Sequence, residues 1–152
     1  MKITFETNDL DPKDVSYVSL GNMTIELDKN IWTSKNRTPD QGFMLFITLD
    51  MIFDILEQIE MGDAKKGIAH FIDSSIELKI ELKKDKIEIR ERKHLIGKIS
   101  LDDFAIALWE AYQNLLNSLG MESAKDLGDM SEDLFLSSIN FEIAFAHALP
   151  MD

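Results

Sequence analysis

The clearest pattern along this chain is an alternation of apolar and charged residues across positions 76–83. A period of two residues is typical of a strand with one buried and one exposed face. The alternation resumes across 87–90 after a Lys84-Asp85 turn, so the two segments predict an antiparallel hairpin whose outer face is charged. Residues 95–99 are expected to extend the same sheet.

Two other segments repeat their apolar residues with the period of an α-helix. The stronger spans residues 101–119 and the weaker spans about 49–61. Each has a polar residue suited to cap its first turn and a glycine suited to the position after its last turn: Ser100 and Gly120 for the first segment, and Thr48 or Asp50 and Gly62 for the second. The pattern therefore predicts two principal helices.

The C-terminal segment 140–149 alternates large apolar side chains with small or polar ones, and we expect it to form a central strand of the sheet. Shorter strand candidates are residues 2–6, 15–20, 23–28, 43–47 and 68–73. Residues 29–42 and 121–133 lack a clear period and are expected to be surface loops.

Strands grouped between two helices indicate an α+β fold with a mainly antiparallel sheet. The sequence contains no repeat and no linker-like segment, so a single domain over residues 1–152 is expected. A hydrophobic content of 45% with nine Phe residues indicates an ordered globular chain. The chain has no cysteine, which excludes disulfides, thiolate metal sites and thiol nucleophiles. No apolar segment has the length of a signal peptide or a membrane span, so we expect a soluble, cytoplasmic protein.

Charge is distributed unevenly along the chain, which carries a net charge of −12. Residues 79–98 contain eight basic and four acidic residues, whereas residues 99–152 contain one basic residue and ten acidic ones. A net charge of this sign steers a basic partner toward the protein and repels nucleic acid and anionic membranes. The basic segment is interrupted by its acids and has no exposed aromatic residue, so a cross-strand charge ladder is favoured over a nucleic-acid surface.

The sequence has no motif for a phosphate loop, a dinucleotide site or a nucleophile elbow, and it predicts neither a cofactor nor an enzyme. His70, His94 and His147 lie in separate predicted elements, and no metal site is expected, although their convergence in space remains open. His147 is expected to be a hydrogen-bonded core histidine on the predicted C-terminal strand. The acids of residues 121–133 do not have the spacing of an EF-hand calcium loop.

A small, acidic, cysteine-free α+β chain without a catalytic motif resembles the immunity proteins of bacterial polymorphic-toxin and contact-dependent inhibition systems. The resemblance implies a non-catalytic protein that binds a toxin domain, often a basic nuclease, and masks its active site. The charged contacts are then expected in the acidic C-terminal third, at Glu122, Asp126, Asp129, Glu132 and Asp133. Asp9, Asp11 and Asp14 form a second possible patch.

Trp32 is a further candidate contact, because tryptophan is enriched among binding hot spots and this one lies in a polar segment. The alternative is that Ile31 and Trp32 fold back and anchor that segment on the core. A second class of function is an acidic secretion chaperone that holds an extended client segment on apolar strips or a strand edge. A third is an enzyme with a dispersed histidine and carboxylate site.

Overall fold

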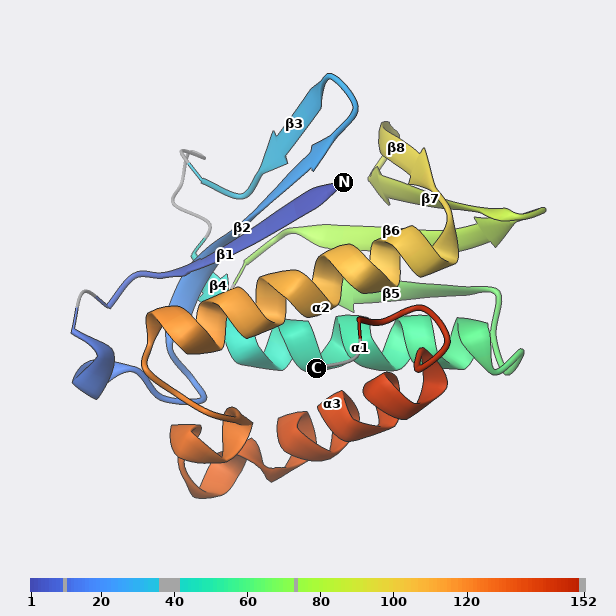
Figure 1. Cartoon of the computed structure of the whole chain (residues 1–152). Coiled ribbons are helices and arrows are strands. Elements are labelled where there is room, and N and C mark those ends of the chain that lie inside the picture. Colours follow the sequence, from blue (N-terminus) through green and yellow to red (C-terminus); the bar gives the residue numbers. More distant parts are fainter. Residues whose placement is uncertain (10, 36–41, 73, 151–152) are drawn as a thin grey trace.

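Figure 1 shows the computed structural model of the chain, which describes residues 1–9, 11–35, 42–72 and 74–150. Over these residues the protein has an α+β fold with two four-stranded antiparallel sheets and three α-helices, which confirms the predicted fold class. Helix α1 (Leu45–Glu60) packs against strands of both sheets and against the C-terminal helix α3 (Glu132–Ala144). Helix α2 (Leu101–Ser118) covers the first strand.

The first sheet is built around strand β2 (Leu20–Leu27), which pairs antiparallel with every other strand of that sheet: β1 (Lys2–Thr7), β3 (Asn30–Thr33) and β4 (Phe43–Met44). Met23, Ile25 and Leu27 alternate with partly exposed residues along β2, so one face of this sheet joins the core. The prediction of a strand over 15–20 is wrong. There the chain leaves a 3-10 turn (Pro12–Asp14), and β2 begins only at Leu20.

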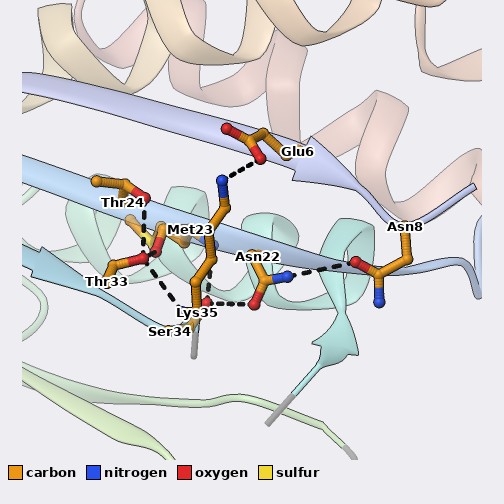
Figure 2. Close-up of polar contacts among 8 residues, drawn as sticks. All are labelled: Glu6, Asn8, Asn22, Met23, Thr24, Thr33, Ser34 and Lys35. Atoms are coloured by element: carbon orange, nitrogen blue, oxygen red, sulfur yellow. Dashed lines mark hydrogen bonds and ion pairs between the residues drawn. The ribbon is translucent and has the colours of Figure 1, made fainter. Parts of the chain in front are cut away.

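A polar network ties the chain after β3 to the first two strands (Figure 2). The buried Ser34 hydroxyl donates to Asn22 Oδ1 at 2.9 Å and accepts from the Met23 backbone N–H at 3.0 Å. Lys35 forms an ion pair with Glu6 of β1. The predicted loop 29–42 therefore begins as an ordered strand and turn, while its residues 36–41 lie outside the described ranges.

The second sheet has the strand order β5 (Lys66–His70), β6 (Glu77–Lys83), β7 (Lys86–Glu91) and β8 (His94–Ile99). It contains the predicted hairpin with its Lys84-Asp85 turn and the predicted extension over 95–99. Lys84 adopts φ 59°, a left-handed conformation that a tight hairpin turn requires. The strand predicted over 68–73 is observed as β5, shifted by a few residues toward the N-terminus.

The two sheets meet where β3 and the last residue of β2, Leu27, lie beside β8. An added Cβ at Gly97 of β8 would stand 2.1 Å from Leu27 Cδ2, so a side chain at this position would occupy the space of Leu27. Trp32 also joins the sheets, because its ring packs edge-on against Phe71 and its Nε1 donates to Glu91 Oε1 of β7 at 2.9 Å. Close contact at this junction fixes how the two sheets face each other.

Helix α2 matches its prediction closely. The Ser100 hydroxyl accepts from the Asp103 backbone N–H at 3.1 Å, and Gly120 follows the helix with φ 68°. Helix α1 begins four residues earlier than the predicted 49–61, so most of the predicted strand 43–47 is helical. Its N-cap is Met44, which has no side-chain cap hydrogen bond, and neither Thr48 nor Asp50 caps it.

The prediction of a central C-terminal strand over 140–149 is wrong. This region forms the second half of α3 and the turns that follow it. Leu134, Ser138 and Phe141 line the buried face of the helix, and Phe145 continues that face beyond its end. Phe141 and Phe145 contact each other, and Phe141 contacts Phe53 of α1, so aromatic packing holds α3 against α1.

Candidate functional site

The predicted acidic contacts lie near the N-terminal end of α3, in or next to three successive helical elements. Asp126 belongs to a short 3-10 turn (Ala124–Leu127), and its Oδ2 accepts from the backbone N–H of Glu122, which precedes the turn, at 2.9 Å. The Asp126 carboxylate therefore stabilises its own turn through this hydrogen bond, which leaves less of it available to a partner. Asp129 lies in the next turn (Asp129–Ser131), and Glu132 and Asp133 form the exposed first turn of α3.

Trp32 lies in the core and offers little surface to a partner. Its side chain is 5% exposed, whereas the neighbouring Ile31 is 71% exposed. The ring is held by Phe71 and Glu91, as described above, which matches the alternative that this segment anchors on the core. As a candidate partner contact, Trp32 is corrected to a residue that joins the two sheets.

Asp133 belongs to a group of acids that are distant in the sequence but lie together in the structure. Asp50 and Asp54 lie four residues apart on α1 and face Asp133 and Ser137 of α3. The Ser137 hydroxyl donates to Asp54 Oδ1 at 3.1 Å and so links the two helices. We call Asp50, Asp54 and Asp133 the acidic cluster.

Burial and mutual repulsion raise pKa values in this cluster. Desolvation is the main reason that the pKa values of Asp50 and Asp54 are raised, and the charge of Asp133 adds to both. The nearby phenol of Tyr17 has its pKa raised to about 12 by burial and by the charge of Asp50. Among the described residues, no Lys or Arg forms an ion pair with a member of the acidic cluster, and Asp50 Oδ1 is buried without a hydrogen-bond partner there.

An exposed apolar strip runs along α3 beside the acidic cluster. It consists of Leu136, Ile139 and Ile143, which are 50%, 40% and 70% exposed, and we call these residues the α3 strip. They lie three and seven residues apart, so they share one face of the helix, and Leu136 is one turn from Asp133. Helix α3 is therefore apolar on two faces, one of which is covered by α1 while the other is exposed.

Two shallow hollows flank the α3 strip. One, of about 480 Å³, lies at the N-terminal end of the helix between Lys125, Phe135 and Leu136. The other, of about 450 Å³, lies at the C-terminal end between Ile143 and the α2 residues Trp109 and Gln113. Side chains of a docked segment could fit into these two hollows.

The basic segment 79–98 forms the charge ladder expected from the sequence. Glu88, buried at its centre on β7, lies 2.9 Å from Lys83 Nζ, 3.5 Å from Lys98 Nζ and 3.7 Å from an Arg90 nitrogen. The close ammonium group of Lys83 is the main reason that the pKa of Glu88 is lowered. Several of these basic side chains are thus committed to an internal acid.

His147 is not the core histidine that the sequence predicted. It lies in the turns after α3, half exposed, with Nε2 3.0 Å from Asp102 Oδ1 and 3.8 Å from Glu60 Oε1. The prediction was wrong because it placed His147 on the buried face of a C-terminal strand, and this segment does not form a strand. His70 and His94 do not join this group among the described residues.

Comparison with known proteins finds no matching family, no matching curated protein and no matching solved structure. Within the described ranges, every helix is too short or too polar to cross a bilayer. The candidate site is therefore defined by its own geometry. The part of the site that lies on α1 could have been predicted from the sequence. Asp50, Asp54 and Glu57 recur there at helical spacing, opposite the apolar stripe.

Proposed function

We propose that this protein is a non-catalytic binding module that docks a basic segment of a protein partner on the acidic cluster and the α3 strip. The observation that carries the proposal is the juxtaposition of two features: carboxylates of α1 and α3 that form no ion pair with a Lys or Arg among the described residues, and an exposed apolar face on α3. A partner with Lys or Arg beside apolar side chains complements both features.

The acidic cluster favours a cationic group for a physical reason. The Asp50 and Asp54 carboxylates are already partly desolvated and are repelled by neighbouring acids, so an arriving ammonium or guanidinium group would relieve repulsion while removing little further hydration from these two groups. The net charge of −12 would speed the encounter, and the α3 strip would slow dissociation by burying apolar surface.

Within this class, we propose that the protein acts in the bacterial cytoplasm as an immunity protein against a basic, nuclease-like toxin. Such a function needs rapid capture and steric masking, and it needs no chemistry on the immunity protein itself. The separation of a charged cluster, which governs association, from an apolar strip, which governs retention, supports that division of roles.

The test compares a double variant of the site with a matched double variant elsewhere. Asp54→Asn with Asp133→Asn removes two charges from the acidic cluster, and Asp28→Asn with Asp85→Asn removes two exposed charges outside it. Each tagged protein is used to capture partners from its native lysate at low and moderate salt, and association rates are then measured with the purified partner. We expect a basic partner whose association rate falls at least about tenfold for the site variant only.

Toxin neutralisation is tested by expressing that partner alone or with each variant. Wild type and the control variant are expected to restore growth, whereas the site variant is expected to restore it poorly. Equal association rates for the two variants would reject the acidic cluster as the docking site, and a partner that is harmless when expressed alone would reject the immunity function.

A secretion-chaperone function is the second candidate, because the α3 strip exposes apolar side chains. The double variant Ile143→Ser with Leu136→Ser tests this function, because it removes two apolar side chains from the α3 strip. A client lost by this variant at every salt concentration, and still bound by the Asp54 and Asp133 double variant, would favour the chaperone.

A further inference from the structure

Three separate segments converge on one point at the end of the helical layer. Glu60 is the last residue of α1, Asp102 lies in the first turn of α2, and His147 follows α3. Figure 1 shows these three helix ends at the same side of the molecule. One ligand atom from each side chain lies within 4.8 Å of the other two.

The separations suit a shared divalent cation. Ligand bonds to zinc are about 2.0–2.2 Å for histidine nitrogen and carboxylate oxygen, which places two ligands of a tetrahedral ion roughly 3.3 Å apart. His147 Nε2 lies 3.0 Å from Asp102 Oδ1 and 3.8 Å from Glu60 Oε1, on either side of that value. The side chains of Asp102 and His147 are half exposed, so small rotations could adjust the geometry and an ion could enter from solvent.

The donor set also limits which cation fits. Calcium and magnesium prefer oxygen ligands alone, whereas an imidazole ligand suits zinc and neighbouring transition ions, and zinc also accepts carboxylate oxygens. With a neutral histidine the three groups carry two negative charges, and no Lys or Arg of the described residues forms an ion pair with Glu60 or Asp102. We propose that Glu60, Asp102 and His147 form a zinc site.

His70 provides an internal comparison. Its Nδ1 lies 3.0 Å from Glu77 Oε1, the same distance as in the pair between His147 and Asp102, but no second carboxylate joins it among the described residues. Within the part of the chain that the structure describes, a close histidine and carboxylate pair is thus present at His70 and at His147, while the three-ligand arrangement occurs only around His147. The bound ion would tie the segment after α3 to the ends of α1 and α2, and its remaining coordination positions would be filled by water. This inference does not rest on the proposed function.

The test is calorimetric titration of the full chain with zinc chloride near neutral pH, after treatment with a chelator. We expect saturable binding of one ion per chain and a melting temperature that rises with zinc concentration. His147→Ala is expected to weaken binding at least about tenfold, since loss of an outer-shell partner alone costs about 10–100-fold. His70→Ala is expected to bind zinc as the wild type does.

A second pair of variants serves if circular dichroism shows that His147→Ala does not fold. Asp102→Asn removes a proposed ligand, and Asp103→Asn, in the same helix turn, is its control. Weakening by Asp102→Asn alone supports the site. Absence of saturable binding to the wild type would overturn the inference and leave an ion pair only. Equal effects of His147→Ala and His70→Ala, or of the two aspartate variants, would overturn it as well.

Discussion

The junction between the two sheets gives the sharpest test of this fold, through Gly97 and Leu27. A Cβ at position 97 would stand 2.1 Å from Leu27 Cδ2 and 2.9 Å from Leu27 Cγ, distances that a packed core cannot hold. Leu27 is 5% exposed and has little room to move. Gly97→Ala is therefore expected to destabilise the protein by about 1–3 kcal/mol through overpacking. For a chain of this size the melting temperature falls by roughly 2–4 °C per kcal/mol.

Leu27→Ala supplies the compensating change. Alone it should destabilise by about 2–5 kcal/mol, because it leaves a cavity in the core. In the double variant the new methyl group enters the space that Leu27 has vacated, so the clash disappears and part of the cavity is filled. We expect the double variant to be no less stable than Leu27→Ala, which corresponds to a favourable coupling of about 1–3 kcal/mol.

Equilibrium unfolding in urea measures the four free energies of this cycle. Gly67→Ala is the control, since its Cβ would stand 2.7 Å from Ile55 of α1 rather than from Leu27. Combined with Leu27→Ala, it should be additive within about 0.5 kcal/mol. Additivity of Gly97→Ala with Leu27→Ala would show that β2 and β8 do not meet as described.

Three further predictions concern charge and capping. Glu88→Gln should destabilise the protein at neutral pH, and because the folded pKa of Glu88 is lowered, this difference should shrink as pH falls below its ordinary value of 4.5 in urea titrations. Asp50→Asn should act oppositely: the folded pKa is raised, so the variant should be more stable above pH 3.8 by at least about 0.2–0.5 kcal/mol through loss of the like-charge pair with Asp54, and the gain should vanish in acid. Ser100→Ala should cost about 1 kcal/mol of α2 capping, read as a melting temperature roughly 2–4 °C lower.

Elements with one regular period and matching end signals were predictable from the sequence. Helix α2 has a continuous apolar stripe between Ser100 and Gly120, and the hairpin of β6 and β7 alternates strictly on both sides of Lys84. Helix α1 was harder, because the run 43–47 is apolar throughout and short apolar runs fit a strand and a helix equally.

The apolar part of the candidate site on α3 was not predicted, because the sequence of this helix also fits a strand. Phe141, Phe145 and Leu149 are spaced by four residues, a spacing that satisfies a strand and a helix alike. The exposed Ile143 fell between them and completed a false alternation. An exposed apolar residue on a helix hides the helical period, so the exposure of Ile143 concealed this face of α3 from pattern analysis.

Consequences for the order of folding follow from the strand sequence of the second sheet. Strands β5, β6, β7 and β8 pair in chain order, so each pairing closes only a short loop and can form as a local hairpin within about 1–10 μs. Helix α3 must instead return to α1 across the whole intervening chain. We expect α3 to dock last, which means that the acidic cluster and the α3 strip come together only in the finished molecule. A partner that requires both would thus ignore nascent or partly unfolded chains and select the completed protein.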